Sequence, residues 1–235
     1  MFKTIKSKYV VLTLLVSSAL FLGLVLSFTS YLKYESWAGD RAGKVIDVSN
    51  GKLEQLTDGE WKQVKKGDSV SLGSRLRTDD NGIASVEVPG IGRFVMASGS
   101  EFELGKDIKE VKNRLPKGTI WMDAKLSSGS SASIATPVAI TSIKGTRFTV
   151  VSDGNRFCAC TCVGEVEVIT NNGKVVKLPA GEFFAFTEGE PLPEKPRSAL
   201  PELEKRSAAF DFCFNCHLVG GKGKLKRDWE RFISS

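Results

Sequence analysis

The sequence has few of the residues that most enzyme active sites need. Its 235 residues include a single histidine, His217, and no spaced pair of carboxylates indicates acid–base chemistry. The sequence therefore argues against Ser-His-Asp and Cys-His catalytic sets. Lysines and arginines give a net charge of +6 but are scattered among almost as many acids, without the basic stripe of a nucleic-acid binder. We expect a non-enzymatic protein with no nucleic-acid partner.

One long uncharged run, Tyr9–Leu32, lies near the N-terminus. At ~1.5 Å per residue a helix of this length reaches ~36 Å, enough to span a hydrocarbon core of ~30 Å. A cleaved signal peptide is the alternative, because Ser36-Trp37-Ala38 has a small-x-small pattern, but this site lies well beyond the run. We expect a signal anchor, a transmembrane helix over residues 9–32, after a cytoplasmic stub of residues 1–8.

The charges around this run predict the orientation of the chain. Lysines precede the run at positions 3, 6 and 8, and positive residues stay preferentially in the cytoplasm. The sequence thus predicts a single-pass protein of the bacterial inner membrane, with its N-terminus cytoplasmic and its main domain in the periplasm. We expect its partner to be another periplasmic or membrane protein.

The stretch from Gly43 to Phe186 has the period of two that β-strands produce and lacks the helical period. Turn signals bound these runs: Asp79–Gly82 precedes Ile83–Val88, and Asn171-Asn172-Gly173 follows Gly164–Ile169. Turn signals at intervals of about 8–12 residues predict a mainly β domain of many short strands, a β-roll or sandwich. Pro137, which falls within one such run, predicts a strand edge or a strand start.

The remaining boundaries follow from composition. A linker at 33–42 precedes the β-domain, residues 43–186, and a proline-rich linker at 187–201 follows it. Its prolines predict a stiff, extended spacer. The tail, residues 202–235, is expected to be partly helical, with a short helix at Glu202–Phe210.

Several short sequence motifs follow one another along the β-domain: Trp61, Gly67-Asp68, Gly73, Arg75–Thr78, Asn81-Gly82, Gly118–Trp121, Ala135–Ala139, Gly145–Val150, Gly164–Val168 and Leu178–Glu182. In this order they resemble the FecR domain family. The resemblance covers about residues 43–186 and implies periplasmic sensing or protein–protein contact rather than catalysis. Proteins that give this family its name also have a cytoplasmic segment that contacts a sigma factor. Only about eight residues precede the predicted anchor, so we do not expect a role in iron-uptake regulation.

Three of the five cysteines lie close together, at Cys158, Cys160 and Cys162. They alternate with other residues, so a straight strand would place all three sulfurs on one face. Two of them could chelate a soft metal, or one could form a disulfide with a cysteine of the tail. As a third interpretation, they are buried thiols that act as small hydrophobic side chains.

The tail contains Cys213-Phe214-Asn215-Cys216-His217, the attachment pattern of c-type haem. Cys213 and Cys216 would bond to the haem vinyl groups, and His217 would ligate the iron. Eighteen residues without a methionine follow His217, too few for a cytochrome fold, so the haem would need cover from the β-domain. Met96 or Met122 could be a distal ligand only if the tail docks there.

Two other uses of these residues stay open. Cys213 and Cys216 with two of the Cys158, Cys160 and Cys162 thiols would make a four-ligand site for zinc or an iron–sulfur cluster, and His217 could replace one thiol. Disulfides could instead join the tail to those cysteines. The sequence thus predicts sensing, signalling or electron transfer with haem on the tail, or alternatively a protein-interaction scaffold locked by metal or disulfides.

Overall fold

The computed structural model describes residues 42–199, and all the regular elements there are strands, β1 to β17. This all-β architecture confirms the fold class predicted for the central domain. Nothing in residues 42–199 forms a helix of the length and hydrophobicity needed to span a lipid bilayer. The predicted anchor at 9–32, the short helix at 202–210 and the residues Cys213, Cys216 and His217 lie outside the described residues.

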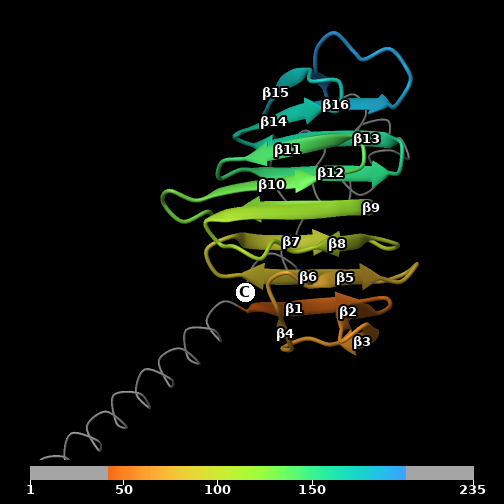
Figure 1. Ribbon diagram of the computed structural model, residues 1–235, viewed down its shortest axis with the longest axis vertical. Coiled ribbons are helices and arrows are strands. Elements are labelled where there is room, and N and C mark those ends of the chain that lie inside the picture. The colour runs from red at the N-terminus through yellow and green to blue at the C-terminus, as the bar shows by residue number, and fades with distance from the viewer. Residues whose placement is uncertain (1–41, 200–235) are drawn as a thin grey trace, which may run out of the picture. The chain divides into compact units, whose positions relative to one another are not determined.

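Hydrogen bonds link all seventeen strands into one continuous sheet, which divides at β9 into two layers, called sheet 1 and sheet 2 below. Sheet 1 has the order β4 (Ser69–Val70), β1 (Gly43–Ser49), β6 (Ile83–Val88), β7 (Gly92–Met96), β9 (Glu110–Ala124), β12 (Arg147–Asp153), β13 (Arg156–Val163), β16 (Glu182–Thr187) and β17 (Arg197–Ser198). Sheet 2 has the order β3 (Glu60–Val64), β2 (Leu53–Thr57), β5 (Arg75–Thr78), β8 (Glu101–Glu103), β9, β10 (Ser131–Ala135), β11 (Ala139–Ile143), β14 (Glu165–Thr170) and β15 (Val175–Pro179). Figure 1 shows the chain advancing from β1 at one end of the stack to β15 and β16 at the other.

The hydrophobic core lies between the inner faces of the two sheets. One continuous cluster of buried side chains includes Phe94, Met122 and Phe148 from sheet 1 and Phe102 and Ile134 from sheet 2. Because side chains of a strand alternate between faces, the residues between these positions point away from the core. The strand register therefore identifies which residues lie on the outer face of sheet 1.

Strand β9 connects the two sheets by changing partners along its length. Its first half pairs with β10, in the one parallel pairing among the described strands, and its second half pairs with β7 and β12. The change occurs near Pro116, which has no N–H to donate to a ladder, and Gly118, whose φ is +98°. Ser100 stabilises the crossing, because the N–H of Thr119 donates to its Oγ at 2.9 Å.

Two details differ from the sequence-based expectation. Pro137 lies in the turn between β10 and β11 rather than in a strand, because Thr136 closes that turn by accepting a hydrogen bond from the Ala139 N–H on Oγ1 at 3.1 Å. The predicted spacer at 187–201 contains β17 and contacts the domain: the Lys174 ammonium donates to the Pro193 carbonyl at 2.5 Å. These contacts position the end of the described chain beside β16.

Candidate functional site

The three cysteines of the domain lie on β13, near one end of sheet 1. In the register with β12 and β16, Cys158 is opposite Val151 and Ala185, and Cys160 is opposite Thr149 and Phe183. Phe157 and Ala159, the residues on either side of Cys158, belong to the main core. The cysteines alternate with these residues and therefore lie on the outer face of the sheet. Cys160 is buried there, and Cys158 and Cys162 are half-buried.

A small second cluster forms around Cys160 on this outer face. It consists of Cys160, Phe183 and Ala199, with Cys158 and Ala185 packed against it. Ala199 reaches the cluster through β17, and its N–H donates to the Gly181 carbonyl at 2.9 Å. The described chain thus ends in contact with the cysteine face, and Cys213 follows fourteen residues later in the sequence.

The β13 cysteines do not form a metal site on their own. Among residues 42–199, no group of three or more His, Cys, Asp and Glu side chains is placed to hold a metal ion. The predicted four-ligand site requires Cys213 and Cys216, and it stays a prediction.

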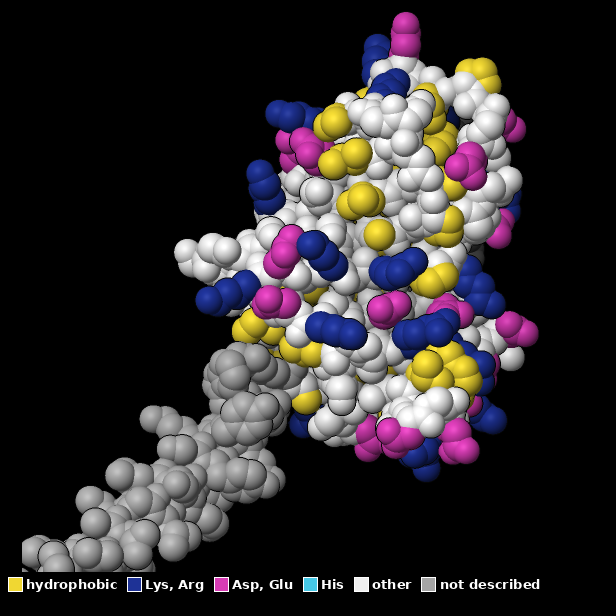
Figure 2. Space-filling view, in the orientation of Figure 1, with side chains coloured by type: hydrophobic (Ala, Val, Ile, Leu, Met, Phe, Trp, Pro, Cys, Tyr) yellow, Lys and Arg dark blue, Asp and Glu magenta, His cyan; other side chains and the backbone are white. Residues whose placement is uncertain are grey.

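A row of alternating charges flanks the cysteine face. Glu87, Arg93, Asp123 and Arg147 are opposite one another on successive strands of sheet 1. Arg93 donates to Glu87 at 2.6 Å, and Arg147 donates to Asp123 at 3.1 Å. These pairs cancel within the row, so it offers no net charge to a ligand. Figure 2 likewise shows Lys and Arg intermingled with Asp and Glu over the face in view.

At the other end of β13, the turn from β12 is fixed by an ion pair between Arg156 and Asp153. The hydrogen bond from Arg156 to this carboxylate raises the pKa of the guanidinium above its usual value. A hollow of about 470 Å³ opens here beside Cys158. Its lining is mainly apolar, with Val151, Ala185 and Phe186 among the residues that form it. The hollow suits an apolar group better than a polar substrate.

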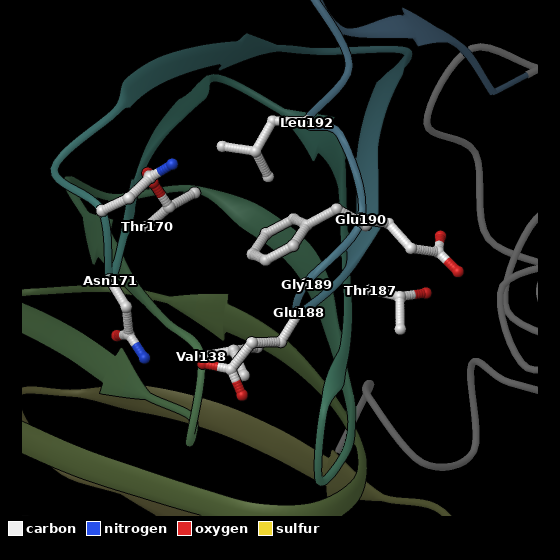
Figure 3. Close-up of a pocket in the computed structure, with 10 residues that line it drawn as sticks. Val138, Thr170, Asn171, Thr187, Glu188, Gly189, Glu190 and Leu192 are labelled. Carbon is white, nitrogen blue, oxygen red and sulfur yellow. The ribbon is translucent and has the colours of Figure 1, made fainter.

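A smaller hollow of about 130 Å³ lies near the end of the domain, where the turn after β14 meets the chain after β16. Figure 3 shows Leu192 projecting into it and Glu190 directed away from it. The amide of Asn171 is already used, because it donates to the Pro137 carbonyl at 2.9 Å. This hydrogen bond commits the Asn171 amide to the β10–β11 turn rather than to a ligand.

Comparison with known families bears on the central strands. Residues 74–176 match the FecR protein family. The FecR match runs from the residue before β5 into β15 and includes the cysteines of β13. It is narrower than the expected 43–186, and the motifs at Trp61, Gly67-Asp68, Gly73 and Leu178–Glu182 fall outside it.

Other comparisons add little to the FecR match. No curated protein matches the chain. Two crystal structures of a candidate anti-sigma factor from Parabacteroides distasonis ATCC 8503, at 2.50 and 1.65 Å, are each 14% identical with a TM-score of 0.48. The alignments cover 57% of this chain and 64% and 65% of theirs, so the chain spans less than two thirds of those proteins.

One feature of the FecR-matching strands was missed by the sequence reasoning. Strands β7 and β9 contain Phe94-Val95-Met96 and Ile120-Trp121-Met122, which are apolar at every position. Such runs are typical of strands covered on both faces. The structure places Val95 and Trp121 on the outer face of sheet 1, in register with each other and in line with the cysteines.

Proposed function

We propose that this chain is a membrane-anchored, non-enzymatic protein of the FecR type that transmits a signal to a protein partner. Residues 9–32 would anchor it, with the β-domain in the periplasm. The match of residues 74–176 to the FecR family carries the proposal. The neutral charge row and the mainly apolar hollow beside Cys158 favour a contact surface over a substrate site.

We propose further that Cys213, Cys216 and His217 hold a c-type haem, which would make the tail a redox- or ligand-responsive element or an electron carrier. The Cys-x-x-Cys-His pattern includes the single histidine of the chain. Ala199 contacts Cys160, so the residues that lead to this pattern start at the outer face of sheet 1. That face provides apolar surface for covering a haem.

The haem proposal is tested by producing the full chain in a host with cytochrome c maturation machinery. We expect a coloured protein whose haem stays attached after denaturation, because thioether bonds are covalent. The intact mass should rise by one haem, and the Cys213→Ser, Cys216→Ser double variant should lose both colour and added mass. A colourless wild-type protein of unmodified mass would rule out the haem.

A second candidate function rests on the placement of the β13 cysteines. They lie on the same face as Ala199, so a zinc ion, an iron–sulfur cluster or disulfides could join them to the tail of a protein-interaction scaffold. If a metal is the link, metal analysis of the protein that carries no covalent haem would show bound zinc or iron that falls in Cys160→Ser. The matched control is Thr161→Ser on the core side of β13, which should keep its metal. Unchanged metal in Cys160→Ser would remove Cys160 from the ligand set.

A further inference from the structure

A row of buried side chains crosses the outer face of sheet 1. Val95, Trp121, Thr149, Cys160 and Phe183 are opposite one another on β7, β9, β12, β13 and β16. Their exposed fractions are 0, 0, 1, 4 and 3%. These residues point away from the core between the sheets, and the outer face of a sheet at the surface of a domain is normally in contact with water. The row therefore has the burial of an interface.

The two clusters of buried side chains described above do not include the middle of this row. Val95 and Trp121 belong neither to the main core cluster nor to the cluster around Cys160. Within residues 42–199, the indole Nε1 of Trp121 and the hydroxyl of Thr149 are buried without a hydrogen-bond partner. A buried donor is costly unless an acceptor reaches it, and a polypeptide backbone supplies such acceptors.

The chain itself reaches one end of this row. Ala199 packs on Cys160 and Phe183, so residue 200 begins where the row ends. The row spans four strand spacings, ~19 Å, between Phe183 and Val95. The thirty-six residues from 200 to 235 would reach ~54 Å even as a continuous helix, so their length is sufficient to cross it. They also contain apolar side chains for such a contact: Phe210, Phe212, Phe214, Trp229 and Phe232.

We infer that residues 200–235 dock on the outer face of sheet 1, over the row from Phe183 to Val95. This is an intramolecular interface between the end of the chain and the FecR-matching strands. Because Ala199 is fixed at β13 and β16, the docked segment brings Cys213, Cys216 and His217 to the face that carries Cys158, Cys160 and Cys162. The inference does not depend on haem, and loss of the haem proposal would leave it standing.

Photo-crosslinking in the full chain tests the docking directly. Val151 is half-buried on the outer face of β12, opposite Cys158, and is replaced with p-benzoylphenylalanine. We expect crosslinks within the same molecule to peptides from residues 200–235. The matched control is Lys112, exposed on the outer face of sheet 2, which should give no such product. Crosslinks from position 151 only to other proteins, to a second copy, or to nothing would overturn the inference.

A charge in the row provides a second test. In the full chain, Trp121→Glu should release the segment and speed tryptic cleavage after Lys222, Lys224 and Arg227 by about tenfold or more. Ile140→Glu, on the exposed face of β11, should leave the rate unchanged. An unchanged rate in Trp121→Glu, with residues 42–199 still resistant, would contradict docking on this row. Rapid cuts inside residues 42–199 would report unfolding, and the crosslinking result then decides.

Discussion

Gly92→Ala is expected to destabilise the β-domain by about 3–5 kcal/mol, among the largest effects of any single methyl group in the protein. Gly92 begins β7, where its φ is +118°, a conformation that residues with a Cβ rarely adopt. A Cβ there would lie 2.1 Å from the Asp123 carbonyl oxygen and 2.8 Å from the Lys125 nitrogen. Asp123 belongs to β9 and Lys125 directly follows it, so both contacts are with backbone atoms. The clash can be relieved only by separating the central strands of sheet 1. Urea denaturation of the purified full chain measures the change.

Gly129→Ala is the matched control for backbone strain alone. Gly129 also has a positive φ, +76°, but nothing lies within 4 Å of the position of its Cβ. We expect a cost of about 1–2 kcal/mol, the price of the left-handed conformation. If both variants lose the same stability, the close approach of β7 to the end of β9 is not the constraint proposed here.

Phe148→Ala is expected to cost about 3–5 kcal/mol through the cavity that it leaves. Phe148 is fully buried on β12, between Met122 of β9 and Thr161 of β13 in the register of the sheet. The cavity would lie on the inner side of sheet 1, so it should also loosen the neighbouring strand β13, which carries the cysteines. Thermal or urea denaturation, followed by circular dichroism, measures the effect.

Ile140→Ala provides the comparison for Phe148→Ala. Ile140 is 43% exposed on β11 and packs little, so its truncation should change stability by less than about 0.5 kcal/mol. Equal effects of the two substitutions would contradict a core located between the inner faces of the two sheets.

The fold could be predicted from the sequence where alternation and turns are local. Ile83–Val88 and the run around Val166 alternate, so their strand character is evident, and the domain is all-β as expected. The path of β9 could not be predicted, because Pro116 and Gly118 usually end a strand and here mark the change from one sheet to the other. The turn at Pro137 was also missed, since the closing hydrogen bonds come from the Thr136 side chain.

The candidate site was predictable only in part. Alternation along β13 indicated that the three cysteines share a face, and the register shows that this face points away from the core. Alternation could not indicate that Ala199 contacts Cys160, because the proline-rich sequence gives no sign of the β16–β17 pairing. Trp121 was assigned to a strand but not to the outer face, since that requires knowing which of its neighbours enter the core.

The proposed coupling joins Cys213–His217 to the β-domain through the outer face of sheet 1. Hydrogen exchange of the full chain tests it by comparing wild type with the Cys213→Ser, Cys216→Ser double variant. We predict faster exchange of the amides of β12 and β13 in the variant, with β2 and β3 unchanged as an internal reference. Identical exchange in both proteins throughout residues 42–199 would contradict the coupling.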